Sequence, residues 1–223
     1  MPTTHTIQTF TFEELDPKAK DLARDWFRKC GASDDWYEST YEDATRVADI
    51  LGIEIGVIEQ KWVNSANGKT GTHTKPRIWF SGFWSQGDGA CFEGRYSYAK
   101  EAPKKIRAYA PTDTTLHSIA DDLQALQRKH GYRLEATVKH SGHYYHSNCT
   151  DIDVTDKRTG DNVGYELEKE LSVELRRFMD WIYRQLESES EYLDSNEYID
   201  DCITANEYQF LADGRHASAA GLD

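Results

Sequence analysis

The sequence predicts an α+β protein, with an antiparallel sheet and helices packed on one face, in a single domain. Three observations lead to this prediction. Alternating apolar and polar residues cluster in the middle of the chain, apolar residues at helical spacing dominate both ends, and the 223 residues are 38% hydrophobic. Central strands flanked by helices are typical of the α+β class. We expect one domain over residues 1–213 and a flexible tail over residues 214–223.

The N-terminal part is predicted to be mainly helical. Residues 6–10 alternate as a short strand. Asp16 can cap a helix over residues 17–29, because a carboxylate accepts hydrogen bonds from the first free backbone N–H groups. A second helix, capped by Ser33-Asp34, ends at Gly52. The apolar stripe of the first helix consists of Ala19, Leu22, Ala23, Trp26 and Phe27.

An aromatic β-hairpin is the predicted centre of the fold. Residues 53–63 alternate as a strand, and a polar loop over residues 64–71 follows them. Residues 78–84 and 90–96 then alternate again, and the glycine-rich segment 85–89 joins them. Two alternating runs separated by a glycine cluster predict a hairpin.

The rest of the chain combines helical periodicity with two further alternating segments. Each helix is bounded by a proline, glycine or capping residue, which is why the boundaries can be placed. The expected helices cover residues 100–109, residues 114–130, a long segment after Gly164 and residues 195–205, and the expected strands cover residues 132–140 and 149–155.

Acidic residues outnumber basic ones. The chain has 39 Asp and Glu against 26 Lys and Arg, which gives a net charge of −13 at pH 7. This balance argues against direct binding to nucleic acid and fits a basic protein partner. No apolar run is long enough for a membrane helix, the N-terminus lacks a signal-peptide pattern, and the four cysteines show no paired spacing. We therefore expect a cytoplasmic protein without a membrane partner.

The aromatic hairpin and an acidic, tyrosine-containing segment are the candidate contact surfaces. Residues 187–213 contain nine carboxylates and no Lys or Arg. Such a segment can bind a basic partner or imitate the phosphates of DNA, and it can equally be a solvated face. The candidate binding residues are Trp84, Gln86, Asp88, Tyr144, Tyr145, Glu191, Tyr192, Asp194, Tyr198, Asp200 and Asp201.

Four potential metal ligands, His140, His143, His146 and Cys149, recur at every third position. Imidazole and thiolate groups are zinc donors. Side chains alternate on a strand, so His143 would point away from His140 and His146 unless the chain bends. The other interpretation is a His- and Tyr-rich hairpin that packs on the sheet. We expect no cofactor, with zinc as the alternative.

Asp88, Cys91 and Glu93 are the alternative catalytic residues. A thiol close to charged groups can act as a nucleophile, but no histidine is tied to Cys91 by the sequence. Asp88 is also explained by the tight turn in which it lies. Glu93 is also explained by a solvated strand face with a cross-strand Glu/Arg pair. We therefore expect no catalytic set on the hairpin.

Five long segments resemble a family of phage and prophage proteins that are labelled as antitoxins of a toxin–antitoxin stability system. These segments are residues 36–44, 80–94, 138–146, 178–186 and 205–210. They contain unusual strings such as Phe80-Ser81-Gly82-Phe83-Trp84 and His143-Tyr144-Tyr145-His146. Residues 60–75 look like an insertion relative to that family.

The resemblance implies a phage-type accessory protein in the bacterial cytoplasm. Such a protein would bind and neutralise a host or toxin protein, and the charge indicates that this partner is basic. The alternative is a metal- or small-ligand-binding enzyme that uses residues 140–149 near Asp88. We expect a binding protein rather than an enzyme.

Overall fold

The computed structural model describes residues 7–30, 35–63 and 68–217, and it confirms the α+β class. The chain divides into two compact units. Unit 1 consists of residues 1–36 and 188–223, and unit 2 consists of residues 37–187. None of the described helices is long and apolar enough to cross a membrane.

Unit 2 is built on a four-stranded antiparallel sheet with the strand order β1-β6-β7-β8. The strands are β1 (Ile53–Ile55), β6 (Gly94–Ser97), β7 (Leu134–His140) and β8 (Thr150–Asp156). Residues alternate between buried and accessible along β7 and β8, because successive side chains point to opposite faces. One face therefore belongs to the core and the other remains polar and uncovered.

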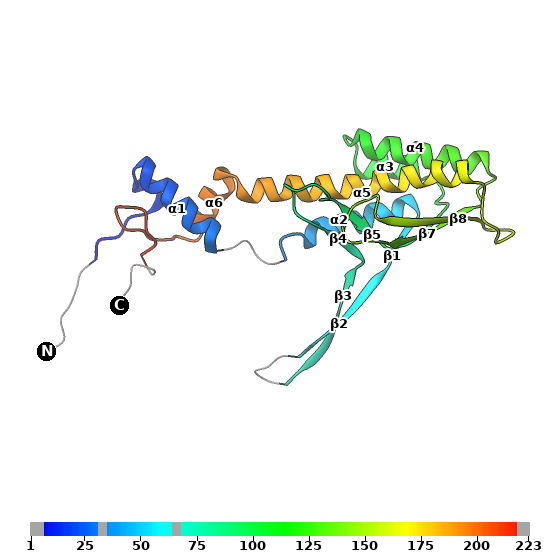
Figure 1. The fold of residues 1–223 in the computed structure, drawn as a ribbon. Coiled ribbons are helices and arrows are strands. Elements are labelled where there is room, and N and C mark those ends of the chain that lie inside the picture. Colours follow the sequence, from blue (N-terminus) through cyan, green and yellow to red (C-terminus); the bar gives the residue numbers. More distant parts are fainter. Residues whose placement is uncertain (1–6, 31–34, 64–67, 218–223) are drawn as a thin grey trace. The chain divides into compact units, whose positions relative to one another are not determined.

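Four helices contribute much of the core of unit 2: α2 (Glu38–Leu51), α3 (Ala102–Tyr109), α4 (Thr114–Lys129) and α5 (Tyr165–Asp194). In Figure 1, α3, α4 and α5 lie on one side of β7 and β8. Asp113 caps α4 by accepting a hydrogen bond from Leu116 N–H at 2.9 Å, and its second oxygen accepts one from the Trp181 indole at 2.7 Å. One carboxylate thus starts α4 and ties it to α5.

The predicted strand over residues 53–63 breaks at Gly56. Its second part, β2 (Val57–Val63), pairs with β3 (Thr70–Pro76), which begins inside the predicted polar loop. These two strands form an exposed ribbon that projects from the sheet of unit 2 (Figure 1). The turn signal of that loop is Asn67-Gly68. Asn67 lies outside the described residues, and Gly68 is described.

The predicted central hairpin forms but is shorter than expected. β4 (Ile78–Phe80) pairs with β5 (Ala90–Phe92), and residues 81–89 form a loop instead of extending the strands. The chain then leaves β5 at Glu93 and enters the large sheet as β6. The alternation of apolar residues continues from β5 into β6, but the strand that accepts and donates the hydrogen bonds changes at Glu93: β5 pairs with β4, whereas β6 pairs with β1 and β7.

Three strand breaks meet at one point, which we call the strand junction: Gly56, Arg77 and Glu93. Gly56 N–H donates to the Glu93 carbonyl at 2.8 Å, and Glu93 N–H donates to the Arg77 carbonyl at 3.0 Å. Arg77 N–H completes the ring by donating to the Gly56 carbonyl at 2.7 Å. The backbone groups freed by the breaks therefore satisfy one another, as buried backbone groups must.

Unit 1 packs η1 (Phe12–Glu14), α1 (Pro17–Cys30) and α6 (Asn196–Ala205) around a small core. Asp16 caps α1 as predicted, by accepting hydrogen bonds from the N–H groups of Lys18 and Ala19. The buried residues of this core are Phe12, Leu15, Ala19, Ala23, Ile199, Ile203 and Phe210.

Three expectations for unit 1 are corrected. Of residues 7–10, only Phe10 pairs with another segment, through a bridge to Phe210, so the opening strand is not formed there. Leu22, predicted to be part of the apolar stripe of α1, is 54% exposed and does not belong to the buried face. Residues 214–217, predicted as the start of a flexible tail, are tied to unit 1, because Gly214 N–H donates to the Leu211 carbonyl and Ala217 N–H donates to the Gln209 carbonyl. The predicted cap at Ser33-Asp34 lies outside the described residues.

Candidate functional site

The loops over residues 81–89 and 141–149 together form an exposed aromatic surface. Trp84 is 92% exposed, Tyr144 is 53% exposed, and Tyr145 has about a third of its surface accessible. We call these three residues the aromatic loop surface. All three are among the predicted binding residues. The structure brings their two loops into contact, at Gly87 and Tyr144, although about 60 positions separate the loops in the sequence.

Asp88 fixes the first of these loops. Its Oδ2 accepts hydrogen bonds from the backbone N–H groups of Trp84 at 2.9 Å and Ser85 at 2.6 Å. From α5, the Tyr183 hydroxyl donates to the Gly82 carbonyl at 3.1 Å. Asp88 therefore acts as the turn-forming residue that the glycine-rich segment requires. The predicted binding residue Gln86 lies exposed in the same loop.

Close backbone contacts hold the second loop against the first. A Cβ atom on Gly87 would lie 3.3 Å from the Tyr144 ring, and one on Gly89 would lie 2.9 Å from the His146 ring. The Tyr145 ring stacks on Trp79 with centroids 6.1 Å apart. The supporting role of Trp79 could not be predicted from the sequence, because its partner Tyr145 is remote in the chain.

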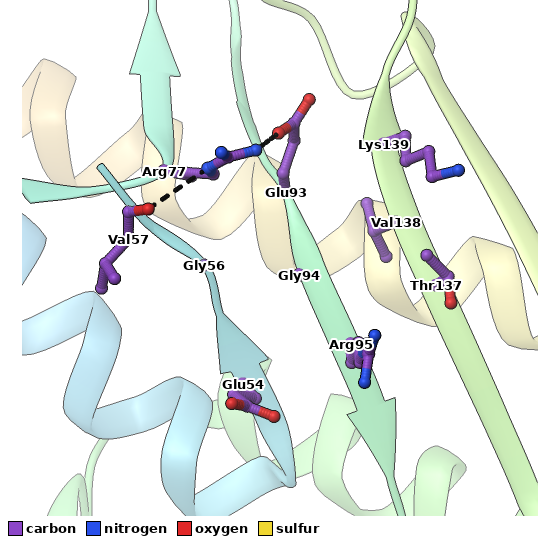
Figure 2. Close-up of a pocket in the computed structure, with 10 residues that line it drawn as sticks. All are labelled: Glu54, Gly56, Val57, Arg77, Glu93, Gly94, Arg95, Thr137, Val138 and Lys139. Carbon is purple, nitrogen blue, oxygen red and sulfur yellow. Dashed lines mark hydrogen bonds and ion pairs between the residues drawn. The ribbon is translucent and has the colours of Figure 1, made fainter. Parts of the chain in front are cut away.

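An open pocket of about 330 Å³ lies at the strand junction, on the uncovered face of the sheet (Figure 2). Its lining includes Arg77, Arg95, Lys139, Glu54 and Glu93. Arg77 Nη1 forms an ion pair with Glu93 Oε2 at 2.6 Å, and the other Glu93 oxygen accepts a hydrogen bond from His140 N–H at 3.2 Å. Sequence reasoning did not find this pocket, because it arises where three strands break.

The alternative catalytic residues do not form a reactive set. Cys91 is fully buried on β5, and burial raises the pKa of its thiol to about 12. Glu93 is engaged by Arg77, and Asp88 holds the loop backbone. A buried, protonated thiol is a poor nucleophile.

The four candidate zinc ligands are all described, and they do not converge. Among the described residues, no three His, Cys, Asp or Glu side chains form a group that could hold a metal ion. His140 Nε2 lies 3.2 Å from the Tyr144 carbonyl oxygen, and His146 Nδ1 accepts a hydrogen bond from Asn148 N–H. His143 is exposed beside Tyr144, and Cys149 is half-buried. These groups support the loop over residues 141–149.

Arginines of α1 neutralise part of the acidic segment. Asp200 accepts two hydrogen bonds from Arg24, both of 2.7 Å, and Asp194 pairs with Arg28 at 3.1 Å. The other predicted binding residues of this segment, which are Glu191, Tyr192, Tyr198 and Asp201, take no part in these pairs. Glu191 and Asp201 are exposed, and the rings of Tyr192 and Tyr198 contact each other with centroids 5.2 Å apart.

Comparison with known families places unit 2 in one family. The family model described as a domain of unknown function (DUF8835) matches residues 36–196, which include all of unit 2. No curated protein and no solved structure matches the chain. The aromatic loop surface and the pocket both lie inside the matched span, whereas α1 and most of α6 lie outside it. Since the match covers more than half of the chain, this protein belongs to the DUF8835 family.

Proposed function

We propose that the protein acts by binding a protein partner, and that the aromatic loop surface makes the central contact. The observation that carries this proposal is Trp84, which is 92% exposed on a loop fixed by Asp88 and Tyr183. Trp and Tyr contribute most of the binding energy at many protein interfaces. A loop that is already ordered loses little conformational entropy on binding.

Charge near this surface favours a basic partner. Burial raises the pKa of the Tyr183 hydroxyl, and the negative charges of Glu187 and Asp88 raise it further. Asp88 within the loop of Trp84 and Glu187 near Tyr183 create a local negative potential, which attracts cations. The exposed Glu191 and Asp201 of the acidic segment form a second candidate contact for the same kind of partner.

The proposed mode of action is occupation of the partner rather than chemistry on it. The buried thiol of Cys91 supports this choice, as does the scattered placement of the four candidate zinc ligands. Neutralisation of a host or toxin protein in the bacterial cytoplasm, which the resemblance to antitoxin-labelled prophage proteins implies, is the form of this function that we propose.

Affinity capture followed by quantitative binding tests the proposal. The immobilised full-length protein should recover a basic protein from a bacterial lysate, and Trp84→Ala should weaken its binding by about 2 kcal/mol, the cost typical of an interface hot spot. Tyr165→Ala is the matched control, because Tyr165 is 71% exposed and lies outside the aromatic loop surface.

Additional variants separate the two candidate surfaces. Tyr144→Ala should weaken binding in the same way as Trp84→Ala, while a Glu191→Gln, Asp201→Asn variant should change mainly the salt dependence and the association rate. A partner that binds Trp84→Ala and Tyr144→Ala as tightly as the unmodified protein would refute the proposed contact.

A further inference from the structure

We propose that the strand-junction pocket binds the phosphoryl group of a small phosphorylated molecule. The pocket is concave, has a volume of about 330 Å³ and is lined by Arg77, Arg95 and Lys139. This volume falls at the lower end of the range for small-molecule sites. The inference concerns a ligand and is independent of the proposed protein contact at Trp84.

Two glycines line the pocket at points where the backbones of the strand junction approach closely. A Cβ atom on Gly56 would lie 3.0 Å from the Arg77 side chain, and one on Gly94 would overlap the Glu54 carbonyl oxygen. In Figure 2, these glycines lie between Val57 on one side and the strand that carries Thr137 and Lys139 on the other. The breaks at the strand junction thus leave a hollow instead of a continuous sheet surface.

The charged side chains that line this hollow favour the binding of an anion. Arg77 is already balanced by Glu93 through their 2.6 Å ion pair. In the strand register Arg95 lies opposite Glu54 and Thr137, and Lys139 lies opposite Asp151 of β8, outside the pocket lining. Neither Arg95 nor Lys139 forms an ion pair within the described part of the chain. With Glu54 as the remaining carboxylate, the lining carries a net charge of +1 (three cations against two anions), although the chain carries −13.

The chemistry of the side chains selects a phosphoryl group. A guanidinium presents a planar set of donors that matches the oxygens of a phosphate. Arg95 can supply these donors, and the Thr137 hydroxyl next to it can supply another. Figure 2 shows the Lys139 ammonium turned away from Arg95, so this flexible, exposed side chain would rotate to reach the ligand. Val57, 60% exposed, offers an apolar wall for the organic part.

Calorimetric titration of the full-length protein with phenyl phosphate tests the inference. We expect binding at one site, weakened about tenfold by Arg95→Gln or by Lys139→Gln, since each removes a charge-assisted hydrogen bond. Arg128→Gln on α4 and Lys105→Gln on α3 are matched controls, because both side chains are exposed outside the pocket and should leave the affinity unchanged.

A variant that should gain affinity guards against effects of misfolding. Glu54→Gln removes the remaining carboxylate, so it should tighten phenyl phosphate binding, which a damaged fold cannot do. Benzoate, which carries a single charge on a similar ring, should bind more weakly than phenyl phosphate. The inference is overturned if phenyl phosphate gives no saturable binding, if benzoate binds more tightly, or if the Arg95→Gln, Lys139→Gln double variant keeps full affinity.

Discussion

Burial decides the chemistry of the thiols in this protein. Cys91 on β5 is fully buried, whereas Cys30 at the end of α1 is exposed. Burial, together with smaller contributions from Cys149 and Glu93, raises the pKa of Cys91 to about 12. Because the thiolate is the reactive form, the two thiols should differ widely in reactivity.

Alkylation should therefore distinguish the cysteines. We predict that iodoacetamide at pH 8 labels Cys30 rapidly and leaves Cys91 unlabelled until the protein is unfolded. Peptide mapping by mass spectrometry after a time course measures both sites in one sample. Rapid labelling of Cys91 in the native protein would show that its thiol is accessible and would reopen its assignment as a nucleophile.

His216 gives unit 1 a pH-dependent stability. Its ring stacks on Trp26 with centroids 4.0 Å apart and an angle of 5° between the planes. Burial lowers the pKa of His216 below its usual 6.5. The folded state therefore binds this proton less readily than the unfolded state, so the contribution of His216 is complete above about pH 6.5 and is lost as the pH falls below it.

Urea unfolding at pH 7.5 and pH 5 measures this effect. Hydrogen exchange of the α1 amides at each urea concentration gives the unfolding midpoint of unit 1. We predict that lowering the pH from 7.5 to 5 decreases this midpoint more for the unmodified protein than for His216→Asn. The comparison removes the contribution of the carboxylates, which both proteins share. An identical decrease in both proteins would exclude His216 as the source.

At the scale of elements, Gly94 determines how closely β1 and β6 can pair. It lies opposite Ile55, and an added Cβ atom would overlap the Glu54 carbonyl. We predict that Gly94→Ala destabilises unit 2 by about 1–3 kcal/mol, as overpacking does. Gly164→Ala is the matched control, because nothing lies within 4 Å of its added Cβ. Equal unfolding midpoints for both variants in urea would contradict this explanation.

Local periodicity predicted most elements but not their partners. The spacing of Leu171, Leu175 and Phe178 predicted α5, because these positions form one face of a helix and are all buried. The breaks at Gly56 and Glu93 could not be predicted in the same way, since the alternation of apolar residues continues across them. Hydrogen bonds between segments remote in the sequence decide where these strands end.

The candidate sites show the same distinction. Trp84, Tyr144 and Tyr145 could be selected from the sequence, because aromatic residues in glycine-rich loops are commonly exposed contact residues. Arg95 and Lys139 could not be combined in one site, since β6 and β7 are separated by two helices in the sequence and meet only through their register. Spacing also suggested a metal site at residues 140–149 that the loop geometry does not assemble.

At the scale of the whole molecule, the acidic charge is only partly available to a partner. Arg24 and Arg28 on α1 bind Asp200 and Asp194, so part of the predicted acidic surface serves to fold unit 1. The aromatic loop surface lies in unit 2, within the span that the DUF8835 family model matches. Partner binding at Trp84 should therefore persist when the acidic residues of unit 1 are neutralised.

The two units should also differ in stability. Unit 1 has a small core centred on Phe210, which is fully buried and contacts Phe12 and Trp26 edge to face. We predict that Phe210→Ala destabilises unit 1 by about 3–5 kcal/mol, the usual cost of removing a buried aromatic ring. Hydrogen exchange should then lose protection in α1 and α6 and keep it in β7 and α4.

Phe92→Ala is the reciprocal variant, because Phe92 is fully buried in unit 2 and contacts Phe178. It should remove protection from β7 and α4 first. Separate unfolding is expected because each unit has its own core, so a local defect opens the unit that contains it. If either substitution removes protection from both units together, α5, which contributes residues to both, couples them into one cooperative structure.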